Sequence, residues 1–364
     1  GGGTKLVRPV AAMGKRVAII EKGRLGGTCL NHGCIPSKML IHTGELCDAI
    51  REAKKYNIEL DTGEMRVDFR ALVDRVTKTI DRDSDSIGPM YDKDPNIDLY
   101  RGHGRFVGRK EIEVNGERLS ADSIFIAVGA RPQIPDIPGL AGTPYMTYYE
   151  ALRAERQPKR LVVVGGGYIA AELGYFFASI GTEVTFLVRS SFLKQEDADI
   201  RDEFTRAFTN KYDVRIGVVP KRVRRDGSEF HIDVSDGQTL VADGLLMATG
   251  IEPMTGDLGL EQTDIRCDEE GFVVVDGTFK TTQPGVWALG DCIGRYFFRH
   301  SVNFEGEYLF RTLFADPHTE PIVYPPMPHA VFTNPEIASC GMRECDLEPG
   351  SYIVGKASYE KSAR

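Results

Sequence analysis

Two cysteines five residues apart, Cys29 and Cys34, are the residues of this sequence best suited to chemistry. In a regular α-helix, residues i and i+5 point about 140° apart, so one unbroken helix cannot bring the two thiols together. A disulfide needs converging Cβ directions, and Gly26, Gly27 and Gly33 give this segment the freedom to bend. So small a ring would stabilise the fold by only about 2 kcal/mol. We therefore expect the pair to serve redox chemistry.

The composition indicates a globular protein with reduced thiols. A chain of 364 residues should form two or three domains. The net charge of −8 gives no field for nucleic acid or an anionic membrane. Seven cysteines form an odd set without the spacing of a secreted disulfide framework. The sequence contains neither a Cys-x-x-Cys motif nor paired histidines, so it predicts no metal site. We expect a cytoplasmic protein whose sequence begins inside a motif.

A glycine turn between a strand and a helix lies in the middle of the chain. Residues 161–164 read as a buried strand, Gly165-x-Gly167-x-x-Ala170 as the turn, 171–180 as a helix and 184–188 as the next strand. Such a turn brings backbone N–H groups and a helix N-terminus to a pyrophosphate. The stretch 161–181 is also long and apolar enough to imitate a membrane span. The glycines and Glu172 favour the strand, turn and helix, so we expect no membrane span.

The same plan occurs earlier in the chain, which indicates an internal duplication. Residues 16–21 read as a strand that ends in Glu21, with Gly3 upstream of it. Each copy is followed by a second signature of Ala-Asp, an apolar strand, Ala-x-Gly and proline, at 119–132 and at 240–253. Chance similarity of two apolar strands is the alternative, and the match along both segments argues against it.

The residues that end these strands predict the nucleotides. A carboxylate at Glu21 can accept both ribose hydroxyls of an unphosphorylated adenosine such as that of FAD; a solvated acid is the alternative. Arg189 occupies the matching place in the second copy, where a cation, assisted by Lys194, suits the 2′-phosphate of NADPH rather than NADH. A merely solvated arginine is the alternative there. Asp291 ends an apolar strand, 286–289, after Gly290, and can accept a hydrogen bond from a sugar-like hydroxyl chain.

The other cysteines have simpler interpretations. Cys47, Cys267 and Cys292 are read as small core residues. Cys340 and Cys345 repeat the spacing of five, but no glycine turn surrounds them.

The segment Cys-Leu-Asn-His-Gly-Cys-Ile-Pro-Ser-Lys at 29–38, with both glycine turns and the Gly-Asp at 290–291, resembles the FAD-dependent pyridine nucleotide–disulfide oxidoreductases. The resemblance implies that Cys29 exchanges with a substrate disulfide and that Cys34 touches the flavin as a thiolate. It implies that Lys38 lies near the flavin with Glu172 as its acidic partner, and that Tyr168 covers the nicotinamide pocket. Further contacts implied are, for FAD, Gly3, Glu21, Lys22, Gly27, Thr28, Lys38, Gly104, Ala127, Gly129, Asp291 and Phe298, and for NAD(P), Gly165, Gly167, Tyr168, Ile169, Glu172, Arg189, Lys194 and Gly250.

The resemblance also predicts an α/β fold of two Rossmann-like dinucleotide-binding domains, the second inserted in the first. The expected FAD domain comprises residues 1–148 and 271–318, the NAD(P) domain 149–270, and the start of an α+β dimerisation domain 319–364. Compared with the family, the sequence lacks about a hundred C-terminal residues, including an acid–base histidine that would act across a homodimer interface.

Arg189 favours a mycothione-like substrate reduced with NADPH. The alternatives are oxidation of protein-bound dihydrolipoamide with NAD⁺, reduction of mercuric ion, and a flavin redox sensor without turnover.

Overall fold

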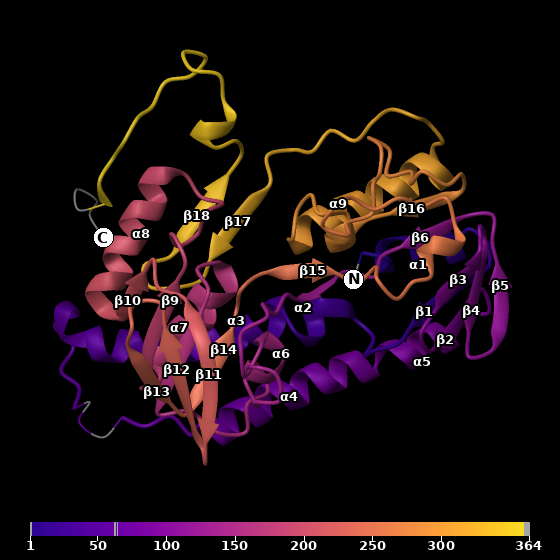
Figure 1. The fold of residues 1–364 in the computed structure, drawn as a ribbon. Coiled ribbons are helices and arrows are strands. Elements are labelled where there is room, and N and C mark those ends of the chain that lie inside the picture. Colours follow the sequence, from indigo (N-terminus) through magenta and orange to yellow (C-terminus); the bar gives the residue numbers. More distant parts are fainter. Residues whose placement is uncertain (1, 62, 64, 360–364) are drawn as a thin grey trace.

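The computed structural model describes residues 2–61, 63 and 65–359. Two α/β units stand side by side in Figure 1, and a short hairpin of the C-terminal segment lies above the left-hand one. Parallel strands form the centre of both units. The fold is therefore the α/β arrangement that the sequence predicts.

The left-hand unit is built on a parallel sheet of order β10-β9-β8-β14. Its strands are β8 (Arg160–Val164), β9 (Glu183–Val188), β10 (Asp213–Ile216) and β14 (Gly244–Met247). Strand β14 and the part of β8 after Arg160 are apolar and buried, as in a sheet covered on both faces, whereas the edge strand β10 is partly polar and is not buried. Helix α7 (Tyr168–Ser179) follows β8 through the glycine turn, and α8 (Ala198–Lys211) follows β9. Helix α7 starts three residues before the expected position, because Gly167 is already extended and serves as its N-cap.

The right-hand unit repeats this plan with shorter pairings. Strand β1 (Val17–Glu21) is parallel to β2 (Ile97–Arg101), and β6 (Ile124–Ile126) is parallel to β16 (Val286–Ala288). Helices α1 (Thr4–Ala12) and α9 (Arg299–Phe310) pack against each other beside these strands. The strand ending in Glu21 and the strand before Asp291 thus belong to one unit, although more than 260 residues separate them in sequence.

Each copy of the duplication also carries an antiparallel meander of three strands. The meanders are β3 (Arg105–Gly108), β4 (Glu111–Val114) and β5 (Glu117–Ser120) in the first copy, and β11 (Pro220–Asp226), β12 (Glu229–Val234) and β13 (Thr239–Ala242) in the second. The two signature segments end in β7 (Ala130–Pro132) and β15 (Ile251–Pro253), which pair with each other. The domain boundaries at residues 148, 270 and 318 stay a prediction.

Helices α2 (Gly27–Asn31), α3 (Cys34–Glu52) and α4 (Phe69–Asp85) connect the two units. Helix α3 packs closely on α7, and a Cβ atom at Gly44 would lie 3.1 Å from Cβ of Ser179. Leu40 and Ile41 of α3 share one buried cluster with aromatic residues of the second unit. Two short helices complete this region, α5 (Ile87–Asp92) and α6 (Tyr148–Ala151).

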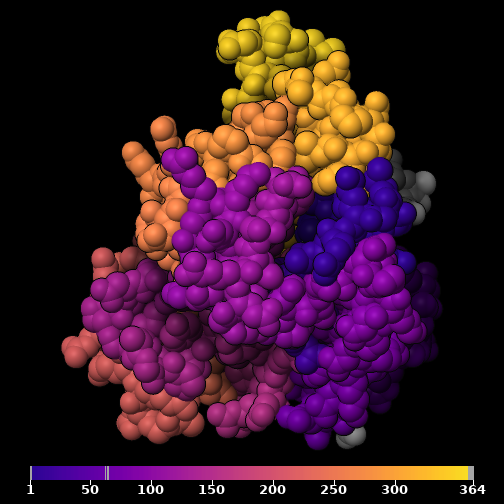
Figure 2. Space-filling view, turned by 90° about the vertical axis from the view of Figure 1, so that its right-hand side faces the viewer, coloured from indigo at the N-terminus to yellow at the C-terminus, as the bar shows by residue number. Residues whose placement is uncertain are grey.

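The C-terminal segment forms the antiparallel hairpin β17 (Pro328–Val331) and β18 (Ile337–Cys340), which packs on α7. Figure 2 shows this segment, in yellow, at the top of the molecule. The third domain expected over residues 319–364 stays a prediction, and its residues 360–364 lie outside the described residues.

Two further sequence interpretations can be compared with the structure. Among the described residues, no helix combines the length and the apolar character needed to cross a bilayer. Cys47 and Cys292 are buried, but Cys267 is exposed, so its interpretation as a core residue is wrong. Cys267 takes part only in an isolated bridge with Val273 at the surface, and a single apolar residue type does not reveal which side of such a bridge faces the core.

The backbone conformation at position 165 requires glycine. Gly165 has a φ of +138°, and an added Cβ would lie 2.1 Å from the carbonyl oxygen of Ala248. We expect Gly165→Ala to lower the free energy of unfolding by about 3 kcal/mol or more, measured by urea denaturation. Gly167→Ala is the matched control, because a Cβ there meets no atom within 4 Å. Equal stability of the two variants would contradict this prediction.

Candidate active site

A continuous cleft of about 3430 Å³ is lined by residues of both units and of the C-terminal hairpin. Its walls include the ends of both nucleotide-type strands and the two cysteines. Such a crevice at the carboxyl ends of parallel strands is where open α/β sheets bind ligands.

The cysteines lie at a break between two helices. Helix α2 ends at Asn31, Gly33 adopts φ −141° and ψ −118°, and α3 begins at Cys34. A Cβ at Gly33 would lie 3.0 Å from the carbonyl oxygen of Thr28, so a larger residue would push the helices apart. Cys29 therefore lies at the N-terminus of α3. There the backbone N–H of Cys34 donates a hydrogen bond to the sulfur of Cys29. The break predicted from the glycines is present.

The two thiols are free and are hydrogen-bonded to each other, with Cys29 half-buried and Cys34 exposed. The hydrogen bond from the Cys34 thiol, helped by the charge of Arg299, lowers the pKa of Cys29 to about 6 although partial burial opposes it. The same hydrogen bond raises the pKa of Cys34. The expectation that Cys34 is the thiolate that touches the flavin stays a prediction, since it depends on contact with that ring.

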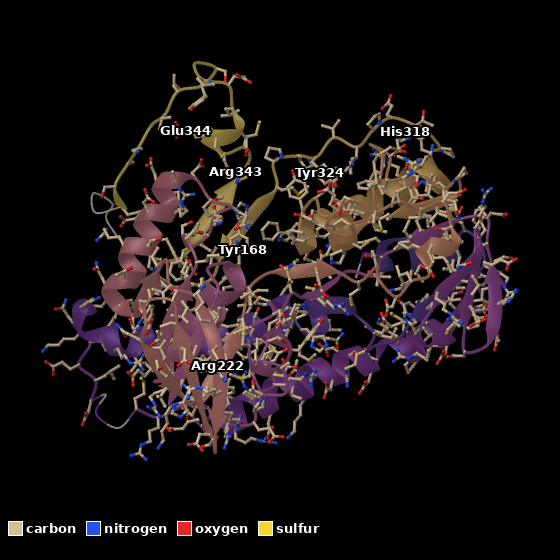
Figure 3. The ribbon with its side chains drawn as sticks, viewed as in Figure 1. Tyr168, Arg222, His318, Tyr324, Arg343 and Glu344 are labelled. Carbon is tan, nitrogen blue, oxygen red and sulfur yellow. The ribbon has the colours of Figure 1, made fainter. Side chains whose placement is uncertain are left out.

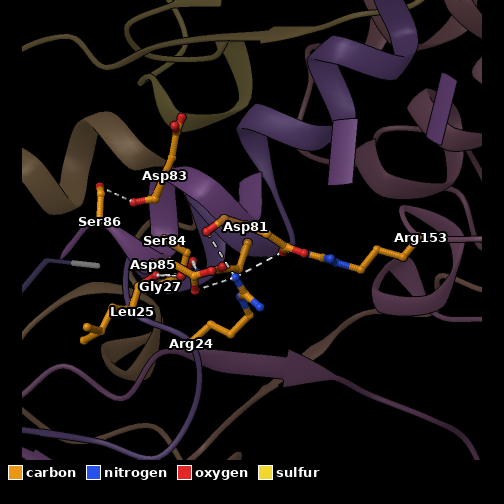
Figure 4. Close-up of polar contacts among 10 residues, drawn as sticks. Arg24, Leu25, Gly27, Asp81, Asp83, Ser84, Asp85, Ser86 and Arg153 are labelled. Carbon is orange, nitrogen blue, oxygen red and sulfur yellow. Dashed lines mark hydrogen bonds and ion pairs between the residues drawn. The ribbon is translucent and has the colours of Figure 1, made fainter. Parts of the chain in front are cut away.

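Polar contacts hold the loop before α2 against α4 (Figure 4). The Arg24 guanidinium lies 3.1 Å from Asp81 and 3.0 Å from Asp85, and Arg153 reaches Asp81 at 2.8 Å. The Ser84 hydroxyl donates to the carbonyl of Leu25 at 2.7 Å. These partly exposed ion pairs each contribute less than about 1 kcal/mol, but together they fix the segment that leads into the cysteines.

Lys38 and Glu172 form an ion pair across the two units. Lys38 follows Cys34 by four residues and so shares its helix face. Its Nζ lies 2.6 Å from Oε2 of Glu172 and 4.7 Å from the ring centre of Phe332. The other carboxylate oxygen of Glu172 accepts the backbone N–H of Phe332 at 3.1 Å. The structure thus brings the two residues together and adds Phe332 as a third partner.

The cleft end formed by the first copy contains most of the residues expected to bind FAD. Glu21 lies at the end of β1 and accepts the backbone N–H of Gly23 at 2.8 Å. Lys22 instead pairs with Asp257 at 3.2 Å. Gly104 approaches β1 closely, since a Cβ there would lie 2.8 Å from Cγ2 of Ile20. Also on the cleft wall are Gly3, Gly27, Thr28, Ala127 and Gly129.

Asp291 supplies the observation that tests whether FAD fits. Burial raises the pKa of its carboxyl group to about 6, and within residues 2–61, 63 and 65–359 no side-chain hydrogen bond to it is found. Asp291 is half-buried and lines the cleft, so its carboxylate can accept a hydrogen bond from a hydroxyl-bearing ligand. The neighbouring backbone N–H of Gly290 donates to Glu305 at 2.7 Å, and Tyr324 donates to the same carboxylate at 2.8 Å. Glu305, fully buried, therefore holds the Asp291 turn in place.

The second glycine turn lines the other end of the cleft with Gly165, Gly167, Ile169 and Gly250. Arg189 and Lys194 are exposed on this wall. No ion pair of either cation is found among the described residues. Both are therefore available to an anionic group of a ligand.

Tyr168 is the first residue of α7 and lies at the same end of the cleft. Its hydroxyl donates a hydrogen bond to Glu196 at 2.9 Å. Phe298, expected beside FAD, packs against Tyr168 at 5.6 Å and His329 at 5.2 Å, measured between ring centres, and the last two rings lie 6.0 Å from each other. Sequence reasoning did not find Glu196 or His329. Glu196 stands in an acidic run that resembles a solvated surface, and His329 is one isolated histidine.

Residues 1–306 match the family model described as pyridine nucleotide-disulphide oxidoreductase. The chain belongs to this family. It is 38% identical over 344 residues to mycothione reductase of Mycobacterium tuberculosis, covering 91% of this chain and 74% of that protein. It is 32% identical to mercuric reductase of Bacillus cereus, covering 94% of this chain and 55% of that protein. Among solved structures, the HOCl-induced flavoprotein disulfide reductase RclA from Escherichia coli has a TM-score of 0.84 at 28% identity, covering 94% of this chain and 76% of that one.

The chain is therefore a pyridine nucleotide–disulphide oxidoreductase of the flavoprotein type. Membership of the family implies FAD and a pyridine nucleotide, and the carboxylate of Asp291, which lines the cleft, and the open side of Gly167 fit such ligands. Within the described residues, no three His, Cys, Asp or Glu side chains converge on a metal-sized site.

The cysteine geometry gives a pH prediction. Because the pKa of Cys29 is near 6, alkylation of the reduced protein at Cys29 should rise with pH through about 6 and level off by pH 7.5. Cys34→Ala removes the thiol donor, so the inflection should move toward the ordinary cysteine pKa of about 8.5. Peptide mass mapping after iodoacetamide measures Cys29 separately from the exposed Cys267. An unchanged inflection in Cys34→Ala would show that the thiol hydrogen bond does not lower the pKa.

Proposed function

We propose that this protein is an FAD-dependent NADPH:disulfide oxidoreductase that reduces a low-molecular-weight disulfide resembling mycothione. The observation that carries the proposal is the Cys29–Cys34 pair, hydrogen-bonded thiol to thiol in the cleft, with the pKa of Cys29 lowered to about 6. A thiolate is the nucleophile in thiol–disulfide exchange. At neutral pH Cys29 therefore carries the charge that attack on a substrate requires.

The thiol steps balance in atoms and electrons. The Cys29 thiolate attacks one sulfur of the substrate disulfide, a mixed disulfide forms, and the other half leaves as a thiolate that takes up a proton. Cys34 then loses its proton and attacks the Cys29 sulfur, which releases the second half and forms the Cys29–Cys34 disulfide. Counted from the Cys29 thiolate and the Cys34 thiol, the protein pair loses two electrons and one proton. The substrate halves gain these two electrons and two protons, the second of which comes from solvent.

When bound, FAD would transfer the electrons of the nicotinamide to the cysteine pair. Glu21, Gly104 and Gly129 would hold its adenosine half, and Asp291 its hydroxyl-bearing chain. Lys38, fixed by Glu172 at 2.6 Å, would place a positive charge beside the cysteines, where it favours a thiolate on Cys34.

Arg189 and Lys194 support NADPH over NADH. Both cations lie at the end of the strand that follows the second glycine turn, where dinucleotide folds bind the adenosine ribose. The family relationship leaves the choice between the two nucleotides open, so this preference is part of the proposal. A homodimer, completed by residues that follow this segment in mycothione reductase, is part of it as well.

The mycothione-like substrate is proposed from the 38% identity to mycothione reductase and from Arg189. Mercuric ion is the second candidate, supported by the 32% identity to mercuric reductase of Bacillus cereus. Oxidation of dihydrolipoamide with NAD⁺ and a sensor without turnover are further alternatives.

The nucleotide preference can be tested at Arg189. We expect Arg189→Ala to lower kcat/KM for NADPH by about 10- to 100-fold, corresponding to about 1.5–3 kcal/mol for a hydrogen bond to a charged group, and to leave NADH unchanged. Arg222→Ala is the matched control, because Arg222 lies on β11 away from the cleft (Figure 3). Equal use of NADPH and NADH by both variants and the wild type would refute the preference.

The substrate can be tested with the FAD-loaded full-length protein. We expect steady-state reduction of mycothione with NADPH to exceed that of glutathione disulfide, lipoamide and Hg²⁺, and Cys29→Ser to abolish it. Faster oxidation of dihydrolipoamide with NAD⁺ would assign the reverse reaction. Bound FAD that is reduced by NADPH without turnover of any substrate would favour the sensor.

A further inference from the structure

Glu196 is a buried carboxylate in the loop between β9 and α8. It is 3% exposed and accepts three side-chain hydrogen bonds, from the Tyr168 hydroxyl at 2.9 Å, from Nε2 of His329 at 2.8 Å and from the Ser339 hydroxyl at 2.6 Å. The three donors come from α7, β17 and β18. A single carboxylate therefore joins the start of the nucleotide-side helix to both strands of the C-terminal hairpin.

This arrangement is costly to assemble. Moving a carboxylate out of water carries a penalty of several kcal/mol, which is offset only when its oxygens are well hydrogen-bonded. Replacing a whole buried ionic cluster by well-packed apolar side chains is often neutral or stabilising. Stability alone therefore gives no reason for a carboxylate here, whereas a need to fix the position of its donors does.

The donors lie where a fixed position matters. Tyr168 follows Gly167 directly and lines the cleft, and its ring packs against Phe298. The His329 ring stacks on Phe298 with ring planes 15° apart and also lies 6.0 Å from the Tyr168 ring, measured between ring centres. Figure 3 shows Tyr168 below the C-terminal segment that carries Arg343 and Glu344. The three rings form an aromatic wall of the cleft, and Glu196 anchors two of them.

The other charged groups near Glu196 are already paired. Arg343 forms an ion pair with Asp346 at 2.7 Å and donates to the carbonyl of Gln195 at 3.4 Å. Asp197, the next residue along the loop, accepts the backbone N–H of Glu344 at 2.7 Å. His329 and Tyr168 are thus the ionisable groups in direct contact with Glu196.

We propose that Glu196 is a positioning residue, which through the Tyr168 hydroxyl sets the orientation of the Tyr168 ring at the nicotinamide end of the cleft. His329 and Ser339 hold Glu196 in turn, so the C-terminal hairpin takes part in shaping the nucleotide site. This inference rests on the proposed function, since it assigns the nicotinamide to this end of the cleft.

The contact can be measured without cofactor or turnover, by nitration of tyrosine with tetranitromethane. Nitration requires the phenolate, and the hydrogen bond to Glu196 together with burial raises the pKa of Tyr168. We expect Glu196→Ala to increase nitration at Tyr168 by about tenfold, since each unit of pKa is worth a factor of ten in phenolate. The tryptic peptide 161–189 carries Tyr168 and the fully buried Tyr175, so Tyr175 is an internal reference.

The consequence for the nucleotide is measured on the FAD-loaded enzyme by stopped-flow. We expect Glu196→Ala to slow flavin reduction at saturating NADPH by about tenfold or more, because a misplaced positioning group costs up to about 100-fold. The Kd of NADP⁺ should change less than about twofold, since the phosphates bind elsewhere. Asp197→Asn is the matched control and should change neither quantity, because it removes a neighbouring carboxylate that does not touch Tyr168.

Ser339→Ala and Glu196→Gln keep the test decisive if Glu196→Ala does not fold, and both should change nitration and flavin reduction in the same direction by smaller factors. Unchanged nitration at Tyr168 in these variants overturns the contact. Increased nitration with an unchanged rate of flavin reduction overturns the positioning role, while the proposed function stands. A wild-type enzyme that takes no electrons from either nicotinamide overturns the proposed function itself, whatever nitration reports.

Discussion

The ion pair between Lys38 and Glu172 lies where the two units and the C-terminal hairpin meet. Lys38 is four residues after Cys34 on α3, and Glu172 is four residues after Tyr168 on α7. Because residues four apart share a helix face, this one contact sets how the cysteines and Tyr168 stand relative to each other. The close approach of Gly44 to Ser179 fixes the spacing of the same two helices. The backbone N–H of Phe332 donates a hydrogen bond to Glu172 and so joins the C-terminal hairpin to this contact.

Three acids in the structure are removed from water in different ways. Glu196 and Glu305 are buried, and each accepts hydrogen bonds from groups on other elements. Asp291 is half-buried and has no such donors in the described part of the chain, and its partial removal from water raises its pKa to about 6. Glu196 and Glu305 are hydrogen-bonded within the protein, while the carboxylate of Asp291 can accept a hydrogen bond from a ligand. The contrast separates acids that organise the site from the acid that would bind FAD.

Features that depend on neighbours in the sequence could be predicted from it. The apolar strands, the glycine turns and the break at Gly33 are local, and all are present. The features that could not be predicted depend on distant partners. Glu196 meets His329 across 133 positions, and no local pattern encodes that meeting. The exposure of Cys267 likewise depends on which side of an isolated bridge with Val273 faces the core.

The pairing of β7 with β15 has a consequence for how the duplicated halves are related. Residues 130, 131 and 132 correspond to 251, 252 and 253 in the repeat, and the observed pairs are 130 with 253, 131 with 252 and 132 with 251. Residue 130 thus faces the counterpart of residue 132, residue 132 faces the counterpart of residue 130, and residue 131 faces its own counterpart. This reciprocal pairing is the rule of a two-fold, isologous contact. A true homodimer would place identical side chains on the axis. Fusion into one chain lifts that restriction, and here Arg131 faces Glu252 at 2.7 Å, an opposite-charge pair that two identical subunits could not make at this position.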